Sequence, residues 1–228
     1  MENLSTGDLT YLAGAFGTDK WGSHFYTPHY QHHFEPIRMQ RLNILEIGVG
    51  GYDDPLKGGE SLRMWKQYFP NSNIYAIDIF DKSALQEDRI KIFRGDQVDK
   101  KFMLKVAEEI GEIDIIIDDG SHLNKHVIET FKIMFPLLKN GGIYAAEDLQ
   151  TAYWKEYGGD GRNLNNPRTS MNFFKQLADC LNYEEFPDRR YKPTYYDRNI
   201  VELHFYHNLV FVYKGLNNEG SNVVKRDK

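Results

Sequence analysis

The sequence predicts an α/β fold built on a seven-stranded, mostly parallel sheet that ends in an antiparallel hairpin. From residue 42 onward, short apolar segments alternate with segments of helical period, a pattern typical of parallel strands joined by helices. The segment 113–118 is almost entirely apolar, as expected for a strand that is buried on both faces. Near the end, segments 200–206 and 209–213 have the spacing of a hairpin.

The individual elements follow in order along the chain. A first helix is expected over 8–16, starting near Thr6 or Asp8, and a second helix follows Thr27, which would cap it with Pro28 in the first turn. The expected strands are 43–47, 74–79, 90–93, 113–118, 143–146, 200–206 and 209–213. The expected later helices are 60–69, 101–110, 126–138 and 171–181. Residues 149–170 show no period, and a loop of that length is usually a lid or disordered.

Length and composition favour one α/β domain with a full core. The chain has 228 residues, of which 41% are hydrophobic and 27% charged, both ordinary values for a globular protein. We expect a helical cap or lid segment over 1–40, a main domain over 41–215 and a flexible tail over 216–228.

The same numbers argue against several classes of partner. The net charge of −5 is unfavourable for a nucleic-acid surface, and no window approaches the roughly 20 apolar residues of a membrane helix. The first residues lack the basic and apolar regions of a signal peptide, and the single cysteine, Cys180, cannot form an internal disulfide. We therefore expect a cytoplasmic protein that binds neither nucleic acid nor a membrane.

A glycine-rich turn after the first strand indicates a nucleoside site. Glu46 precedes Gly48 and Gly50, where backbone must pass close to a ligand without a Cβ in the way. Asp78 ends the next strand, where a carboxylate can hold a ribose diol. Asp53 stands where a dinucleotide fingerprint needs its third glycine, and its charge would repel a pyrophosphate. The turn thus suits a ligand that carries positive charge.

Four carboxylates follow the fourth and fifth strands. Asp118 and Asp119 end one strand, and Glu147 and Asp148 end the next. Such acids repel one another unless a cation lies among them, and oxygen ligands suit Mg²⁺, with Mn²⁺ or Ca²⁺ also possible. Asp119, Glu147 and Asp148 are the expected ligands, provided that the chain has left strand geometry at the last two. His122 could then accept a proton from a substrate hydroxyl.

A structural alternative assigns these polar residues to helix capping. Asp118 or Ser121 would cap the helix that begins near Lys125, and Asp148 would cap a short turn.

Several motifs in this sequence resemble those of the metal-dependent macrolide sugar O-methyltransferases, of the mycinamicin 2″-O-methyltransferase type. They are G-T-D-K-W-G (17–22), Y-T-P-H-Y (26–30), L-E-I-G-V-G-G-Y (45–52), G-G-x-S-L-R-M-W-K (58–66), I-D-I-F-D-K (77–82), D-D-G-S-H (118–122) and E-D-L-Q-T-A-Y-W (147–154). The resemblance covers residues 12–155 with the motifs in order. It implies the Rossmann-like fold of class I S-adenosylmethionine-dependent methyltransferases, whose seven strands close with a hairpin.

By this resemblance the chain would transfer a methyl group from S-adenosylmethionine to a sugar hydroxyl. The residues implied to bind S-adenosylmethionine are Glu46, Gly48, Gly50, Tyr52, Ser61, Asp78, Asp96, Gln97 and Asp118. Asp119, Glu147 and Asp148 would bind Mg²⁺, with Mn²⁺ possible, and His122 would be the catalytic base. The acceptor would be a small molecule or glycan bearing a sugar, and a homo-oligomer is expected.

Two other functions remain open from the sequence. A metal-dependent hydroxylase would use His122 and Asp119 with iron, but an iron triad needs a second histidine, such as His126 or one near the N-terminus. A non-catalytic nucleoside-binding module of the same fold is the third candidate, although the complete set of acids argues against it.

Overall fold

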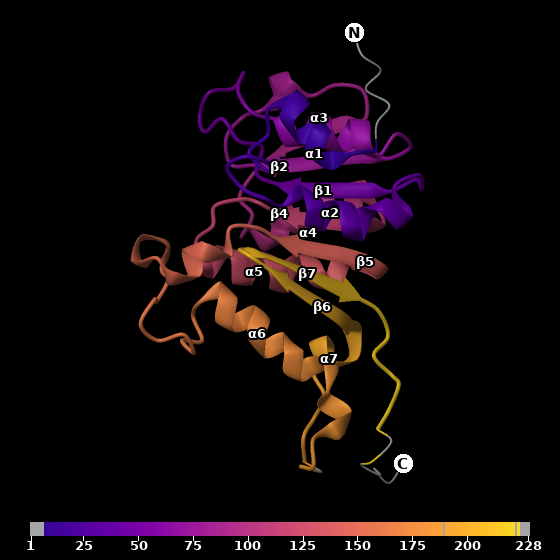
Figure 1. Ribbon diagram of the computed structural model, residues 1–228, viewed down its shortest axis with the longest axis vertical. Helices are drawn as coiled ribbons and strands as arrows, with labels where there is room; N and C mark the ends of the chain where they lie inside the picture. Colours follow the sequence, from indigo (N-terminus) through magenta and orange to yellow (C-terminus); the bar gives the residue numbers. More distant parts are fainter. Residues whose placement is uncertain (1–6, 189, 222, 224–228) are drawn as a thin grey trace. The chain divides into compact units, whose positions relative to one another are not determined.

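In the computed structural model of this chain, residues 7–188, 190–221 and 223 are described. The chain divides into two compact units, residues 1–121 (the first unit) and 122–228 (the second unit). The strands are assigned to one sheet in the order β3-β2-β1-β4-β5-β7-β6 (Figure 1), which confirms the predicted α/β fold. The expected divisions at residues 40 and 215 stay predictions, and residues 222 and 224–228 of the expected tail lie outside the described residues.

Four parallel strands form the sheet of the first unit. They are β1 (Asn43–Ile47), β2 (Asn73–Asp78), β3 (Ile90–Arg94) and β4 (Ile113–Asp118), each within one residue of its predicted bounds. β1 lies between β2 and β4, so that Ile47 pairs with Ile77 on one side and with Asp118 on the other. The carboxyl ends of parallel strands meet at one edge, and the residues that follow β1, β2 and β4 gather there.

The helices of the first unit begin and end largely where their periods predict. They are α1 (Leu9–Phe16), α2 (Thr27–Phe34), α3 (Glu60–Tyr68) and α4 (Lys100–Ile110), with 3₁₀ turns η1 (Glu35–Ile37) and η2 (Ser83–Leu85). Asp8 caps α1 by accepting a hydrogen bond from the Tyr11 amide, at 3.0 Å. The predicted cap at Thr27 is wrong, because Thr27 is already helical and its hydroxyl lies 2.8 Å from that of Thr10.

Aromatic packing joins the N-terminal helices to α3. The Tyr30 and Trp65 rings lie 5.1 Å apart, and those of Phe34 and Phe69 lie 5.5 Å apart. All four side chains are buried, and α1 also packs against α3. Residues 17–26, which connect α1 to α2, are thereby fixed within the first unit.

An antiparallel arrangement characterises the second unit. Its strands are β5 (Leu138–Ala146), β6 (Ile200–Tyr206) and β7 (Leu209–Lys214), and β7 pairs with both of the others. The helices are α5 (Asn124–Met134), α6 (Ser170–Leu181) and α7 (Tyr195–Asn199), with η3 (Phe135–Leu137), η4 (Leu149–Tyr153), η5 (Lys155–Tyr157) and η6 (Tyr183–Glu185). The predicted hairpin is confirmed. The helix expected to reach residue 138 ends at Met134, because Pro136 cannot donate a backbone hydrogen bond.

Segment 149–170 is ordered, and Asn124 holds it. The side chain of Asn124 is buried, and its amide donates hydrogen bonds to the carbonyls of Thr151 and Tyr157, both at 3.0 Å. Its Oδ1 accepts from the Ser170 amide at 2.7 Å and from the Ser170 hydroxyl at 3.0 Å. One side chain therefore ties the two 3₁₀ turns of the segment to the start of α6. A role for the segment as a lid stays a prediction.

We expect replacement of Asn124 by alanine to loosen this segment. Four hydrogen bonds are lost and buried polar groups are left unpaired, so the free energy of unfolding should fall by about 2–4 kcal/mol. Asn182→Ala is the control, since that amide bonds a single carbonyl at an exposed position. Urea unfolding gives the energies, and limited proteolysis should cut 149–170 faster in the Asn124 variant only. Equal stability of the two variants would contradict this prediction.

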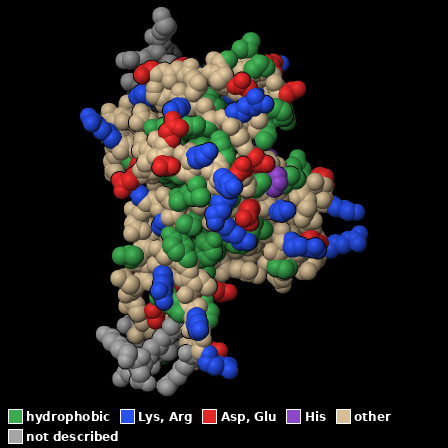
Figure 2. Space-filling view, turned by 180° about the vertical axis from the view of Figure 1, so that it is seen from behind, with side chains coloured by type: hydrophobic (Ala, Val, Ile, Leu, Met, Phe, Trp, Pro, Cys, Tyr) green, Lys and Arg blue, Asp and Glu red, His purple; other side chains and the backbone are tan. Residues whose placement is uncertain are grey.

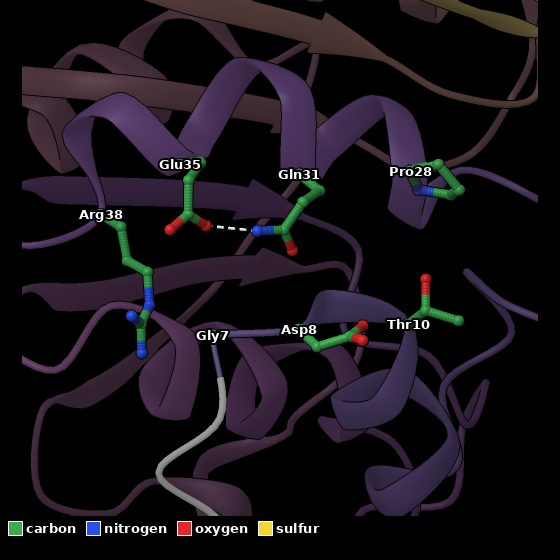
Figure 3. A pocket seen from close by; sticks show the side chains of 7 residues that line it. All are labelled: Gly7, Asp8, Thr10, Pro28, Gln31, Glu35 and Arg38. Carbon is green, nitrogen blue, oxygen red and sulfur yellow. Dashed lines mark hydrogen bonds between the residues drawn. The ribbon is translucent and has the colours of Figure 1, made fainter.

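On the face shown in Figure 2, Lys and Arg side chains are interspersed with Asp and Glu side chains. A shallow hollow lies between the start of α1 and the helix α2 with its turn η1 (Figure 3). There the Gln31 amide bonds Glu35, and Arg38 bonds the carbonyl of Tyr68 at 2.9 Å. Among the described residues, no helix is long and apolar enough to cross a bilayer.

Candidate active site

The glycine-rich turn after β1 depends on residues without a side chain. Gly48 has φ +97°, and a Cβ built on it would lie 2.2 Å from the backbone oxygen of Asp119. Gly50 and Gly51 also have positive φ, of 79° and 71°. The turn is therefore closed tightly against the end of β4 at Gly48 and against the backbone of Lys57 at Gly51, whereas a Cβ on Gly50 would meet nothing nearer than 3.9 Å. A turn without side chains leaves its main chain accessible to a ligand.

Gly48→Ala should disrupt both this turn and cofactor binding. The methyl group meets backbone rather than a movable side chain, and with the strain of positive φ we expect a loss of about 2–4 kcal/mol in stability. Gly14→Ala is the matched control, because Gly14 lies in α1 with nothing near its would-be Cβ. Thermal unfolding and calorimetry with S-adenosylhomocysteine test the prediction. Normal stability and affinity in the Gly48 variant would contradict it.

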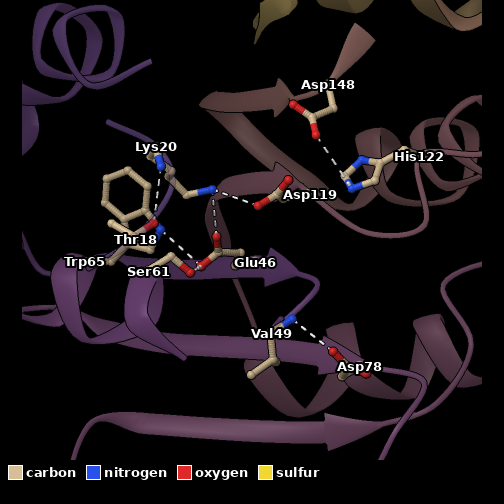
Figure 4. Close-up of polar contacts among 10 residues, drawn as sticks. All are labelled: Thr18, Lys20, Glu46, Val49, Ser61, Trp65, Asp78, Asp119, His122 and Asp148. Carbon is tan, nitrogen blue, oxygen red and sulfur yellow. Dashed lines mark hydrogen bonds and ion pairs between the residues drawn. The ribbon is translucent and has the colours of Figure 1, made fainter. Parts of the chain in front are cut away.

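Asp78 links the end of β2 to the glycine-rich turn. Its Oδ2 accepts a hydrogen bond from the Val49 amide at 3.0 Å, and its Oδ1 accepts one from the Phe80 amide at 2.8 Å (Figure 4). Each carboxylate oxygen has a second lone pair, so the geometry leaves acceptors for a ribose diol. The contact with ribose stays a prediction.

Glu46 is completely buried, and its carboxylate points into the first unit. Oε2 accepts hydrogen bonds from the Ser61 hydroxyl at 3.0 Å and from the Trp65 indole at 3.1 Å. Oε1 lies 3.2 Å from the ammonium of Lys20. Burial raises the pKa of Glu46 to about 7, although the positive charge of Lys20 opposes the shift. Glu46 and Ser61 thus bind each other, and their contact with a cofactor stays a prediction.

The remaining predicted cofactor residues differ in their surroundings. Gln97 is buried, accepts a hydrogen bond from the Ser121 amide at 2.9 Å and donates to Asp118 at 3.3 Å. Asp96 is exposed and accepts from the Val98 amide at 3.0 Å. Tyr52 has φ +48° and a side chain that is 86% exposed. Gln97 and Asp118 are therefore brought together by the fold, whereas Tyr52 is available to a ligand.

The chain leaves strand geometry directly after β5. β5 ends at Ala146, Glu147 is buried, and Asp148 has the left-handed φ of +53°. This meets the condition under which two consecutive acids can face one ion. Nε2 of His122, itself at φ +56°, lies 3.8 Å from Oδ2 of Asp148 (Figure 4). The second unit therefore pairs the predicted base with a predicted metal ligand.

Asp119 is held at the end of β4 by the first unit. Its amide donates to the carbonyl of Ile47 at 2.9 Å, which extends the pairing of β4 with β1. Its Oδ2 accepts a hydrogen bond from the ammonium of Lys20, also at 2.9 Å, and its side chain is 24% exposed. Asp119 is thus oriented by backbone and side-chain contacts together.

The alternative that the Asp148 side chain caps a short turn is wrong. Asp148 occupies the capping position of η4, but its side chain makes no capping bond; its backbone carbonyl accepts from the Thr151 amide instead, at 3.1 Å. The capping position of α5 is Leu123 rather than Asp118 or Ser121, and Leu123 makes no side-chain capping bond. Helix capping therefore does not account for Asp148.

Sequence reasoning did not assign a role to Lys20, which lies between α1 and α2. The side chain is fully buried and contacts both Glu46 and Asp119. The sequence contained an indication of this role, because Glu46 lies within the apolar strand 43–47, where a buried carboxylate requires a counter-charge, and Lys20 belongs to the first motif of the chain.

Comparison with known proteins defines the class. No family model matches the chain. Its fold resembles that of MycE methyltransferase from the mycinamycin biosynthetic pathway, in complex with Mg and SAH, with a TM-score of 0.92 and 47% identity. The match covers 97% of this chain and 57% of that one. A structure of MycE that also contains mycinamycin VI gives a TM-score of 0.91. The fold is that of a class I S-adenosylmethionine-dependent methyltransferase.

The chain is also similar in sequence to several curated O-methyltransferases. The chain is 48% identical over 215 residues to mycinamicin VI 2''-O-methyltransferase of Micromonospora griseorubida, covering 93% of this chain and 54% of the relative. It is 47% identical over 215 residues to demethylmacrocin O-methyltransferase of Streptomyces fradiae, with the same coverage. A tetracenomycin-C rhamnosyl 2'-O-methyltransferase of Streptomyces olivaceus is 47% identical over 210 residues, with 92% and 55% coverage. The chain is similar to these sugar O-methyltransferases and spans about half the length of these relatives.

Proposed function

We propose that this chain is a Mg²⁺-dependent O-methyltransferase, which moves a methyl group from S-adenosylmethionine to a hydroxyl of a sugar on a glycosylated metabolite or polysaccharide. The observation that carries the proposal is the pairing of His122 with Asp148 where the chain has left β5. Identity of 47% to a methyltransferase that was crystallised with Mg and SAH supports it.

The residues present fit both groups. For S-adenosylmethionine, the turn at Gly48 has no room for a Cβ, and Asp78 keeps acceptors beyond its two backbone bonds. For the metal, Asp119, His122 and Asp148 each present an atom that divalent ions bind, and Glu147 precedes Asp148 in the chain. We assign Asp119, Glu147 and Asp148 as ligands, with Mn²⁺ as a possible substitute for Mg²⁺. When bound, the ion would lower the pKa of a sugar hydroxyl next to it.

The transfer itself needs a base and alignment. His122 would accept the proton of the acceptor hydroxyl, and bound S-adenosylmethionine would supply the methyl group to the resulting oxygen, with a neutral thioether as the leaving group. Asp148 lies beside His122 and can stabilise the protonated imidazole. Holding donor and acceptor in line supplies much of the rate.

Other proposals concern the partners and the surroundings of the protein. Relatives are named for macrolide and tetracenomycin glycosides, so we take a sugar-bearing small molecule as the first acceptor to test. A cytoplasmic location, a homo-oligomer and the absence of nucleic-acid and membrane partners remain part of the proposal. The hydroxylase and the non-catalytic module are not favoured, since these relatives are named as O-methyltransferases.

A screen of glycosylated acceptors with isotopically labelled methyl donor tests the proposed function. Each acceptor is incubated with Mg²⁺ and, in parallel, with a chelator. We expect label on a sugar hydroxyl only when Mg²⁺ is present, and mass spectrometry of the product identifies the position. Equal transfer in chelator would overturn the metal dependence. Binding of S-adenosylhomocysteine without transfer to any sugar would favour the non-catalytic module.

A further inference from the structure

Lys20 is a fully buried cation in the first unit. It lies between α1 and α2, with no exposed side-chain surface. The turn around it is fixed by hydrogen bonds from the Tyr26 amide to the Lys20 carbonyl, at 3.1 Å, and from the His24 amide to the Asp19 carbonyl, at 3.0 Å. Lysine is almost never fully buried unless it is paired, so its position calls for a specific partner.

Two carboxylates share the ammonium of Lys20. Nζ lies 3.2 Å from Oε1 of Glu46 and 2.9 Å from Oδ2 of Asp119 (Figure 4). Because Ser61 and Trp65 already hold the other oxygen of Glu46, that carboxylate is a fixed anchor. Asp119 is the partially exposed member of the group, at the end of β4. Lys20 therefore connects the buried carboxylate of Glu46 to the partly exposed carboxylate of Asp119.

We propose that Lys20 is a positioning residue, which holds Oδ2 of Asp119 so that Oδ1 faces the divalent ion. The inference rests on the proposed function, because it takes Asp119 as a metal ligand. Without the ammonium, Glu46 and Asp119 would repel each other and Asp119 could turn away. With it, one oxygen is engaged and the carboxylate keeps a single orientation.

Mn²⁺ binding, followed by electron paramagnetic resonance of the free ion, tests the proposal without relying on turnover. Lys20→Met alone leaves the buried Glu46 unpaired and threatens the fold. The informative variant is therefore Lys20→Met combined with Glu46→Gln, compared with Glu46→Gln alone. Partners that orient metal ligands contribute about 10–100-fold in affinity, so the double variant should bind Mn²⁺ at least about tenfold more weakly. Glu46→Gln alone keeps the bond from Lys20 to Asp119 and should bind nearly as well as the natural protein.

Two further variants separate this inference from the proposed function. Asp119→Ala should abolish the Mn²⁺ site; if it does not, or if the natural protein binds no Mn²⁺, the proposed metal site itself fails. Lys214→Met removes another buried lysine, one that bonds the carbonyls of Pro136 and Leu138 in the second unit, and should leave Mn²⁺ affinity unchanged. Loss of the site in Asp119→Ala, together with full Mn²⁺ affinity in the folded double variant, would overturn the role of Lys20 alone. Circular dichroism establishes folding in each case.

Discussion

Asp119→Ala is expected to lower metal-dependent methyl transfer by about 10³-fold or more while leaving the binding of S-adenosylhomocysteine largely intact. The backbone amide of Asp119 donates to the Ile47 carbonyl and its carboxylate accepts from Lys20, so the substitution removes a charge from a fixed position. The glycine-rich turn lies against the backbone of Asp119 at Gly48, and that backbone is kept in the variant. Initial rates over a Mg²⁺ titration and calorimetry measure the two effects separately.

Asp119→Asn provides the matched comparison. The amide oxygen can still accept the hydrogen bond from Lys20, but the negative charge is gone. If the negative charge of Asp119 matters most, the asparagine variant should be nearly as inactive as the alanine variant. Its free energy of unfolding should be closer to that of the natural protein. A variant at Asp119 that methylates at the natural rate in chelator would refute the assignment.

His122→Asn should lower kcat by about 10²–10⁴-fold, the range contributed by a positioned acid or base. Asparagine is the suitable replacement because His122 has φ +56°, a left-handed conformation that asparagine tolerates better than alanine. The expected change is in kcat, with KM for S-adenosylmethionine and the affinity for Mn²⁺ retained.

The same variant decides between two roles for His122, since its side chain could also serve as a metal ligand. Loss of Mn²⁺ binding in His122→Asn would show that the imidazole binds the ion, and the base would then have to be sought elsewhere. His204→Asn is a control, because that histidine lies on β6 and pairs with Glu202. It should retain both turnover and Mn²⁺ binding.

Most of the sheet could be predicted because its signals are local. A strand that is buried on both faces, such as 113–118, is apolar along its whole length, and hairpin spacing identifies β6 and β7. The predicted ends of helices are less accurate where tertiary contacts determine them. Thr27 is bonded by Thr10 rather than capping α2, a contact between residues 17 positions apart that no local pattern contains.

The candidate site was predictable in part for the same reason. Acids at strand ends can be found by counting, because the fold brings the ends of parallel strands to one edge. Lys20 could not be assigned in this way, since its partners Glu46 and Asp119 are 26 and 99 positions away and its burial depends on the packing of α1 and α2. Segment 149–170 shows no helical or strand periodicity, because its conformation depends on contacts with residues outside it, such as the hydrogen bonds from the Asn124 amide.

The contact between Gly48 and the main chain of Asp119 has a consequence for redesign. Because two backbones lie against each other there with no side chain between them, the glycine-rich turn and the end of β4 cannot be altered independently. Segment 149–170 is bonded by the side chain of Asn124 and carries exposed Tyr153 and Trp154. Substitutions that aim to change the proposed acceptor therefore have more freedom at these exposed positions than beside the glycines.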